Sequence, residues 1–504
     1  MLRRVHAGTR REPQVRRRRE GGDREPTTAR LGEAAGSFSR GACHAVEERG
    51  VLGDPSGEVS DRRRHATQPG SAAGEKVSET VGVSLLGAGN IGAGVIAALS
   101  AGASRYAARV GRPIEVRRVL VRDTARVRAG LAPHQIVGRL EDVLGDPGTQ
   151  IVIEIMGGEH PAREAIEAAL RSGRHVVTAN KEVMAKAGGE LLQIAADHGV
   201  RLLYEASVGG GIPVIGPLSR DLLANEVSAI TAIINGTTNY MLTAMTQQGA
   251  DYADVLAEAQ RLGYAEPDPT ADVEGIDAAY KIAVLCGLAF NVEIRPDEVA
   301  RQGITSITAR DIAYAERLGY VIKLLASARL ISGAVAATVQ PTLVGANEPL
   351  AKVDGVLNAV QFEGDLVGRV LFEGPGAGPG PTSSSILADV LDVAQDVVTG
   401  RRPLAFVPRR RLRVALPAEH EARYYLRIAV QDQPGVLARI AAVLGEQQIS
   451  IASVIQFDRA TADGTAELVF TTHQASGGAL QTAVAAIRAM DVVREVGNVL
   501  PMAG

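Results

Sequence analysis

The sequence has few cysteines and no long apolar run, and both absences exclude classes of protein. Its 504 residues include only two cysteines, Cys43 and Cys286, which cannot form a disulfide framework. Neither lies in a Cys/His spacing of the kind that binds zinc. No apolar run reaches the length of a membrane span, and no apolar signal-peptide core is present. We therefore predict a cytoplasmic enzyme with no membrane partner.

The charge is distributed unevenly along the chain. Residues 1–76 carry 16 Lys/Arg against 11 Asp/Glu, a net charge of +5, whereas the whole chain carries −3. The remainder is therefore acidic, which argues against nucleic acid as a partner. Residues 1–79 lack sustained apolar runs, so we predict a disordered tail, and its acids argue against a transit peptide. Whether this tail belongs to the native product stays open, because a protein sequence does not show start codons.

The composition and a glycine-rich motif near the start of the body favour an α/β protein with a Rossmann-type nucleotide-binding domain at 80–217. The composition is 46% hydrophobic and 22% charged with 56 Gly, which is typical of that class. A predicted strand at 81–86 runs into Gly-Ala-Gly-Asn-Ile-Gly at 87–92, and a helix is predicted over 94–109. This order indicates a dinucleotide cradle. Gly87 permits the tight turn, Gly89 lets the backbone approach the pyrophosphate, and Gly92 allows close helix–strand packing.

Further candidates follow the later strands of this domain. The second strand ends in Arg122-Asp123, where Asp123 suits the ribose of NAD and Arg122 the 2′-phosphate of NADP. The choice of cofactor stays open, with a preference for NADP. A strand at 175–179 ends in Asn180-Lys181, which places a cation at the ligand-binding edge of a parallel sheet. The glycine-rich bend after Glu205 suits a hard cation, and a plain domain hinge is the alternative.

An acidic loop precedes an apolar helix in the middle of the chain. Residues 263–281 contain five acids and two prolines, and the helix is predicted to begin near Gly275. Asp277 and Lys281 are four residues apart, so they share one face of this helix. The pattern indicates a pocket where acids hold an ammonium group and a lysine handles a proton. The alternative is a surface loop with one intrahelical ion pair.

The second half of the chain predicts two further domains. Residues 218–370 read as an α+β substrate/dimerisation domain, with a polar turn at 235–239 before a helix at Tyr240. A Gly/Pro-rich loop at 372–385, with capping residues from Thr382 to Ser385, leads into a helix at 386–398. We expect this return segment, 371–400, to close over the cofactor.

After a predicted linker at 401–421, the pattern of residues 422–504 predicts strands and helices in the order β-α-β-β-α-β. The junction Asp432–Leu437 resembles that of an ACT domain, an amino-acid-sensing module. The alternative is a ferredoxin-like packing module that binds nothing.

The motifs together resemble homoserine dehydrogenase, from Val81 to the C-terminus. They are Gly-Ala-Gly-Asn-Ile-Gly, Thr-Ala-Asn-Lys181, Tyr-Glu205-Ala-Ser-Val-Gly-Gly-Gly-Ile-Pro, Asn-Gly-Thr-Thr-Asn and Gly-Tyr-Ala-Glu266-Pro-Asp-Pro, followed by Asp277 and Lys281. The resemblance implies interconversion of L-homoserine and L-aspartate 4-semialdehyde with NAD or NADP. One motif departs from the family, because Gly378-Pro-Gly-Pro-Thr stands where Gly-Gly-x-Pro-Thr is common.

The resemblance implies roles for individual residues. Lys281 is the acid/base residue with Lys181 beside it, and Glu266, Asp272 and Asp277 contact the substrate. The cofactor residues assigned are Gly87, Gly89, Asn90, Ile91, Gly92, Arg122, Met156, Lys181, Gly263 and Gly378. The sodium site consists of Glu205 with backbone groups of Val208, Gly210 and Ile212.

Regulation and assembly are also implied by the resemblance. Homoserine lies on the route to threonine, methionine and isoleucine, so we expect threonine to bind the ACT domain of a homo-oligomer. Two alternatives remain open: a non-catalytic amino-acid sensor, and a dehydrogenase of the same architecture that acts on another amino acid.

Overall fold

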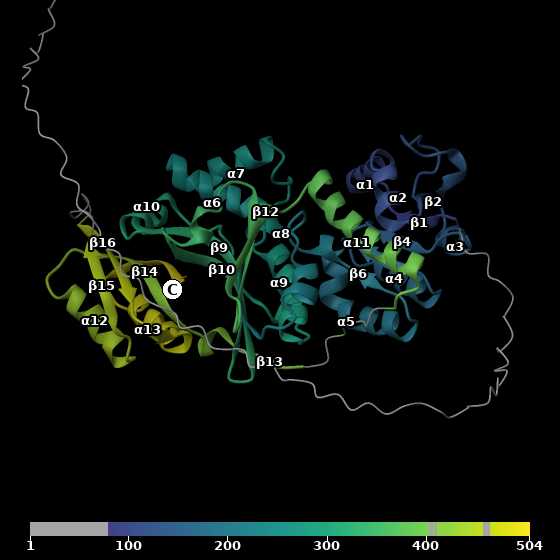
Figure 1. Ribbon diagram of the computed structural model, residues 1–504. Coiled ribbons are helices and arrows are strands. Elements are labelled where there is room, and N and C mark those ends of the chain that lie inside the picture. The colour runs from purple at the N-terminus through teal and green to yellow at the C-terminus, as the bar shows by residue number, and fades with distance from the viewer. Residues whose placement is uncertain (1–78, 403–406, 408–410, 457–463, 504) are drawn as a thin grey trace, which may run out of the picture. The chain divides into compact units, whose positions relative to one another are not determined.

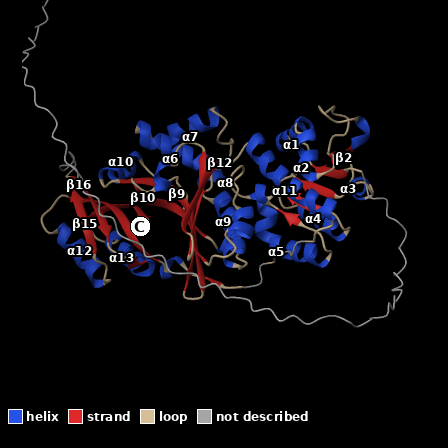
Figure 2. Cartoon of the chain, in the orientation of Figure 1, coloured by secondary structure: helices blue, strands red, loops and turns tan. Residues whose placement is uncertain are grey.

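The computed structural model describes residues 79–402, 407, 411–456 and 464–503 (Figure 1). The predicted tail therefore lies outside the described residues apart from Glu79, as does part of the predicted linker 401–421. Figure 2 shows that helices and strands make up most of the described chain. Within these residues, every helix is too short or too polar to cross a membrane.

The first half of the chain builds a parallel sheet of six strands. Their order is β3-β2-β1-β4-β5-β6, which is the doubly wound order of a Rossmann fold and confirms that prediction. The strands are β1 (Val81–Leu86), β2 (Ile114–Leu120), β3 (Ile136–Val137), β4 (Ile151–Glu154), β5 (His175–Thr178) and β6 (Leu202–Leu203). All six strands are parallel, but β2 and β3 lie on one side of β1, and β4 to β6 lie on the other. This change of side leaves a crevice at the carboxyl ends of β1 and β4.

Helices bury both faces of this sheet, because successive strand side chains point to opposite sides. Leu85 packs into one core and Leu86 into the other, and both are fully buried. One face is covered by α1 (Asn90–Ala101), α2 (Ala103–Val110) and α11 (Pro379–Thr399). The other is covered by α4 (Ala162–Arg171) and α5 (Lys181–Asp197), and α3 (Leu140–Leu144) lies beside β2. Burial on both faces explains the apolar character of the central strands β1 and β4, whereas β2, nearer the edge, is only partly buried and carries charged residues.

A second, largely antiparallel sheet holds the remaining long strands. Its order is β12-β11-β7-β9-β10-β18-β14-β16-β15. The strands before the C-terminal region are β7 (Val227–Ile233), β8 (Ala300–Arg301), β9 (Tyr320–Ile331), β10 (Ala334–Gly345), β11 (Leu357–Gly364) and β12 (Gly368–Pro375). The helices that accompany them are α6 (Gly236–Gln248), α7 (Tyr252–Arg261), α8 (Thr270–Val273), α9 (Ile276–Phe290) and α10 (Ala309–Arg317). The helix predicted to begin near Gly275 is thus confirmed.

The C-terminal region has the predicted β-α-β-β-α-β order. Its elements are β14 (Glu421–Gln431), α12 (Val436–Glu446), β15 (Ile451–Gln456), β16 (Thr465–Thr472), the short β17 (Ala475–Ser476), α13 (Gly477–Arg488) and β18 (Val493–Met502). The strand order β18-β14-β16-β15 is that of a ferredoxin-like sheet. Leu343 of β10 pairs with Met502 of β18, so this sheet continues the preceding one. The short β13 (Arg413–Val414), within the predicted linker, also pairs with β10.

Three predictions of local structure are wrong. The single helix over 94–109 is two helices that meet at Gly102. The polar turn at 235–239 is only Asn235 in the cap position, because residues 236–239 already form the first turn of α6. The loop at 372–385 is short, since β12 extends to Pro375 and α11 begins at Pro379. Thr382–Ser385 therefore lie inside the helix and do not cap it; Pro379 is tolerated because the first turn needs no amide donor.

A buried polar cluster joins α10 to the C-terminal sheet. Asp311 is fully buried, and its carboxylate accepts hydrogen bonds from Arg427 Nε (2.8 Å), Asn498 Nδ2 (2.7 Å) and the Tyr425 hydroxyl (3.2 Å). Thr308 adds a hydroxyl donor at 2.6 Å. Burial opposes ionisation, but these donors and the Arg427 charge hold the pKa of Asp311 below its usual value.

Candidate active site

The glycine loop after β1 has the geometry of a dinucleotide cradle. Gly87 has φ +107°, and a Cβ on it would lie 2.9 Å from the Ile155 carbonyl oxygen. A Cβ on Gly92 would lie 2.8 Å from the Gly87 carbonyl oxygen, so the helix packs close to the turn. A Cβ on Gly89 meets nothing within 4 Å, which leaves open space at the N-terminus of α1. That terminus has no side-chain cap and no acid in its first turn, so it can receive an anion.

The start of α11 lies beside this cradle. Gly378 has φ +112° and occupies the cap position of α11. A Cβ on Gly94 of α1 would lie 2.8 Å from Ser383 Oγ, so the two helices touch through a glycine. Gly263, which has φ +78°, follows α7. The return of the chain therefore places residues 378–383 against α1, although nearly 300 residues separate the two segments.

The loop after β4 is held by a buried acid. Glu154 accepts hydrogen bonds from the Met156 amide (2.8 Å) and from Thr178 Oγ1 (2.6 Å), and its burial raises its pKa. Thr178 Oγ1 in turn accepts the Asn180 amide at 3.0 Å. The Asn180 side chain caps α5 through the Val183 amide. These bonds set the loop at Met156 and the first residue of α5, Lys181, at the same edge of the sheet.

The two cofactor-selecting candidates after β2 differ in their contacts. Both Arg122 and Asp123 are exposed. The Asp123 carboxylate accepts the Ala125 amide at 3.0 Å, which is a local turn. Among the described residues, no hydrogen bond or ion pair engages the Arg122 guanidinium. The acid thus has a structural role in its own loop, whereas the arginine is available to a ligand.

Two lysines and one buried aspartate form a cluster beside the carboxyl edge of the parallel sheet. Lys281 Nζ donates to Asp277 Oδ2 at 2.7 Å, as their helical spacing predicts. Lys181 Nζ contacts the other oxygen of Asp277, across 96 residues of sequence. The side chain of Asp277 is 6% exposed, that of Lys281 12% and that of Lys181 42%. Lys181 therefore faces the crevice, while Lys281 lies deeper.

The electrostatics of this cluster follow from burial and pairing. Burial alone would raise the pKa of Asp277, but the Lys281 and Lys181 charges outweigh it and hold that pKa far below its usual value. Asp277 is therefore ionised at neutral pH. One carboxylate thus fixes the positions of two ammonium groups, which gives a site with a net positive charge from these three side chains.

Two residues that the sequence did not single out complete the cluster. Asn235 Nδ2 donates to Asp277 Oδ2 at 3.0 Å and to Asp272 Oδ1 at 2.7 Å. The Ile234 carbonyl accepts from Lys281 Nζ at 2.7 Å. Both residues follow β7, which is antiparallel to β9 and β11, so the carboxyl-edge rule applied to Lys181 does not extend to them. The Asn-Gly-Thr-Thr-Asn motif was the available signal.

The other acids of the loop lie further out. Asp272 is half-buried and touches Asn235, so the structure brings it to the edge of the cluster. Glu266 is exposed, and its backbone carbonyl accepts a hydrogen bond from Gln260 Nε2 at 3.1 Å. Within the described residues, its carboxylate takes no part in the hydrogen bonds around Asp277.

The predicted cation site is a tight turn around Glu205. The buried Glu205 carboxylate accepts the amides of Val214 (2.5 Å), Ile215 (2.8 Å) and Gly216 (2.6 Å). Gly210 has φ +56°, and its carbonyl accepts Ser385 Oγ at 2.7 Å. The turn thus brings together a buried carboxylate and the Gly210 carbonyl, while α11 packs on it.

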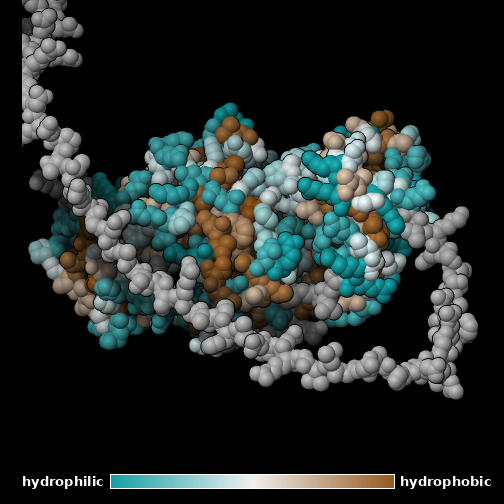
Figure 3. All heavy atoms as spheres, in the orientation of Figure 1, coloured by the Kyte–Doolittle hydropathy of each residue, from teal (hydrophilic) through white to brown (hydrophobic). Residues whose placement is uncertain are grey.

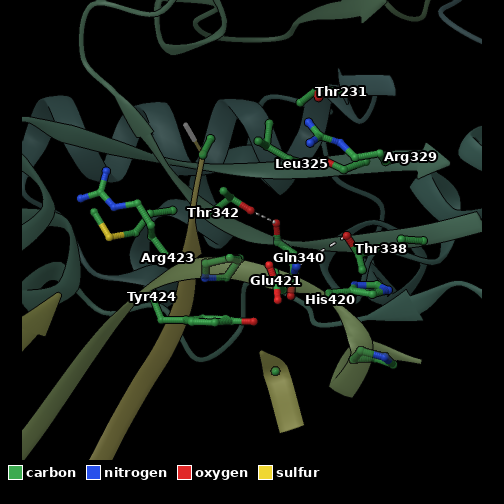
Figure 4. A pocket seen from close by; sticks show the side chains of 18 of the residues that line it. Thr231, Leu325, Arg329, Thr338, Gln340, Thr342, His420, Glu421, Arg423 and Tyr424 are labelled. Carbon is green, nitrogen blue, oxygen red and sulfur yellow. Dashed lines mark hydrogen bonds between the residues drawn. The ribbon is translucent and has the colours of Figure 1, made fainter. Parts of the chain in front are cut away.

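A separate hollow lies on the second sheet. A cavity of about 1710 Å³ is lined by β7, β9 and β10, including Thr231, Arg329 and Gln340, and by residues 420–424. Figure 4 shows these side chains directed into the cavity from both sides. Figure 3 shows apolar residues gathered over the neighbouring strands, close to β12 in Figure 1. Neither lysine of the cluster lines this cavity.

Comparison with known proteins agrees with this geometry. Residues 87–205 match the family model "Homoserine dehydrogenase, NAD binding domain", residues 213–391 match "Homoserine dehydrogenase" and residues 424–491 match "ACT domain". A homoserine dehydrogenase of Synechocystis sp. is 41% identical over 432 residues, which are 84% of this chain and 99% of that protein. The chain belongs to the homoserine dehydrogenase family.

Solved structures of homoserine dehydrogenases share the fold. The enzyme from Thiobacillus denitrificans is 39% identical, covers 84% of this chain and 98% of its own, and has a TM-score of 0.80. A hyperthermophilic archaeal homoserine dehydrogenase in complex with NADPH is 25% identical, covers 64% of this chain and 99% of its own, and has a TM-score of 0.54. The family assignment makes this protein an oxidoreductase with a nicotinamide-dinucleotide-binding domain and an ACT domain.

Proposed function

We propose that this homoserine dehydrogenase interconverts L-homoserine and L-aspartate 4-semialdehyde, with Lys281 as the acid/base residue. The observation that carries the proposal is the cluster of Lys181, Asp277 and Lys281, which includes a residue at the carboxyl edge of the sheet that carries the nucleotide cradle. Lys281 is held by Asp277 and the Ile234 carbonyl, so its ammonium has a fixed position from which to exchange a proton with the substrate oxygen.

The remaining roles follow from charge and exposure. The bound nicotinamide supplies or accepts a hydride at C4. The more exposed Lys181 faces the crevice, where it can contact substrate and cofactor. Asp277, Asp272 and Glu266 supply acids for the substrate ammonium, and the exposed Glu266 lies on a loop that Pro267 stiffens.

For the cofactor we propose NADP, bound by the residues assigned from the sequence. Open space at Gly89 and the uncapped start of α1, with Asn90 and Ile91, fit a pyrophosphate. The exposed Arg122 suits the 2′-phosphate. The archaeal relative solved with NADPH supports this choice. Met156, Gly263 and Gly378 complete the assignment.

We also propose a sodium ion at the Glu205 turn, held with carbonyls of Val208, Gly210 and Ile212. Three amides occupy part of the Glu205 carboxylate, but a carboxylate has about four lone-pair sites, so one can face a cation. A carbonyl likewise keeps a second lone pair after accepting one hydrogen bond. An all-oxygen set of this kind suits a hard cation, which would stiffen the connection between the two sheets.

Regulation and assembly complete the proposal. Threonine is the proposed effector of the ACT domain, at the junction Asp432–Leu437, where residues 432–435 are exposed and α12 begins at Val436. Gly435 in this junction has φ +90° and leaves open space. A second copy is the proposed cover for the hollow and apolar face on the second sheet, which gives a homo-oligomer in the cytoplasm.

One assay tests the central claim and separates it from its rivals. Purified protein is supplied with aspartate semialdehyde and NADPH, then with NADH, and cofactor oxidation is followed. Oxidation of NADPH supports the proposal, and preference for another amino-acid aldehyde supports a different dehydrogenase. Turnover of neither cofactor with any substrate would leave only the sensor alternative.

The effector is tested by titrating threonine into the wild type and Leu437→Glu. Leu437 lies in the first turn of α12 and is 45% exposed, so this change alters the proposed site without removing a fully buried side chain. We expect inhibition that the variant weakens. Deletion of the ACT domain is a poor test, because it would leave the Asp311 carboxylate without Arg427.

A further inference from the structure

Asn235 lies where the end of β7, the acidic loop and the start of α9 meet. It follows β7, is 6% exposed, and uses every polar atom of its side chain. Oδ1 accepts the Thr238 amide at 2.9 Å and so caps α6. Because an amide N–H must face an oxygen, this bond fixes the orientation of the side chain, with Nδ2 toward the acids.

The two hydrogens of Nδ2 go to different acids. One goes to Asp272 Oδ1 at 2.7 Å, next to the end of α8, and one to Asp277 Oδ2 at 3.0 Å, in the first turn of α9. Asp277 Oδ2 also accepts Lys281 Nζ, whereas Oδ1 contacts Lys181. The Asn235 bond therefore prevents the carboxylate from turning, so that each oxygen keeps its own lysine.

Neighbouring backbone strengthens this arrangement. The Ile234 carbonyl, one residue earlier, accepts Lys281 Nζ at 2.7 Å. The end of β7 thus contacts the lysine directly and its aspartate through Asn235. β7 is hydrogen-bonded on both edges, by β11 and β9, so this end is rigidly placed.

We infer that Asn235 is a positioning residue of the reaction, which orients Asp277 and through it Lys281 without touching the substrate. The inference rests on the proposed function of Lys281. A merely structural reading assigns Asn235 only the cap of α6. The two readings differ in which half of the amide matters: the Nδ2 donors for positioning, and the Oδ1 acceptor for capping.

Two substitutions separate these halves. Asn235→Asp keeps an oxygen for the Thr238 amide but removes both donors, and Asn235→Ser also caps helices yet cannot reach both acids. If Asn235 positions the cluster, both variants lose kcat by about 10- to 100-fold, as expected for a small misplacement of a catalytic group. KM should change little, and the melting temperature of Asn235→Ser should stay near that of the wild type. That of Asn235→Asp should fall, because the new carboxylate is buried beside Asp272 and Asp277.

A matched control exists at the other end of β7. Asn225 Oδ1 accepts the Val367 amide at 2.9 Å and its Nδ2 donates to the Leu222 carbonyl at 3.2 Å. Asn225→Asp therefore removes the same kind of donor, far from the cluster, and should leave kcat unchanged. Normal kcat in both Asn235 variants would overturn the inference. A loss confined to Asn235→Asp would also overturn it, because the added negative charge alone would then explain the loss.

A double variant links the effect to Lys281. If Asn235 acts through Lys281, Asn235→Ser combined with Lys281→Ala should be no slower than Lys281→Ala alone. Additive losses would contradict the inference while leaving the role of Lys281 intact. If Lys281→Ala itself keeps normal kcat, the proposed function fails, and the positioning role fails with it.

Discussion

Asp277 and Asp311 are both buried carboxylates held by cations, yet their surroundings differ in one respect. Asp277 pairs with Lys281 and with Lys181, whose side chain is 42% exposed at the crevice. Asp311 is enclosed by Arg427, Tyr425 and Asn498, all of them buried. Burial and a lowered pKa are common to both sites. What distinguishes the proposed reactive site from the structural one is a cation with access to a ligand.

The largest effect is expected at the reactive end of this comparison. Lys281→Ala should lower kcat by a factor of about 10² to 10⁴, the usual contribution of a general acid or base. Steady-state kinetics with aspartate semialdehyde measure it. Lys186→Ala is the control, because Lys186 forms surface ion pairs with Glu159 and Glu182. Equal losses in both variants would show that the effect is not specific to the cluster.

The next effect concerns stability at the structural end. Asp311→Ala leaves the buried Arg427 without its main partner, which should lower the free energy of unfolding by about 3–5 kcal/mol. Denaturant unfolding measures the change, and kcat should stay close to wild type wherever the variant is folded. The exposed Asp297, paired with Arg295, gives the control Asp297→Ala, expected within about 0.5 kcal/mol. A marginal loss at Asp311 would mean that water reaches this cluster.

Lowering the pH should reduce the stability that each of the two buried carboxylates contributes. Replacing Asp311 separates its contribution from that of Asp277. The folded pKa of each acid lies below the unfolded value of about 3.9. Each contribution is therefore complete above that pH and is lost as pH falls through the folded pKa. The melting temperature of the wild type should fall below about pH 4, and less steeply in Asp311→Asn. Identical slopes would assign the acid sensitivity to other groups.

The smallest effect is expected at an exposed cation. Arg122→Ala removes a charge that no described residue engages, so stability should hardly change. If Arg122 pairs with a 2′-phosphate, KM for NADPH should rise by roughly fivefold, as for an exposed ion pair of about 1 kcal/mol. KM for NADH is the internal control. Equal changes for both cofactors would favour Asp123 as the cofactor-selecting residue.

Local sequence patterns predicted the features that short segments control. The strand at 81–86 and the following glycines were read directly, because tight turns and buried strands impose their residues locally. The Asp277–Lys281 pair follows from the helical repeat alone. Predictions were wrong at 235–239 and 372–385, where polar and Gly/Pro-rich residues resemble loops but are stabilised as helix starts by packing.

The sequence by itself determined the nucleotide cradle, the family and the lysine–aspartate pair on α9. Only the tertiary structure brought Lys181 to Asp277 across 96 residues and Ile234 to Lys281 across 47. It also placed Asn235 between two acids and enclosed Asp311 with Arg427, 116 residues away. The physical reason is that a turn or helix is fixed by neighbours in the chain, whereas a buried charge is stabilised by whichever donors the packed sheets bring to it.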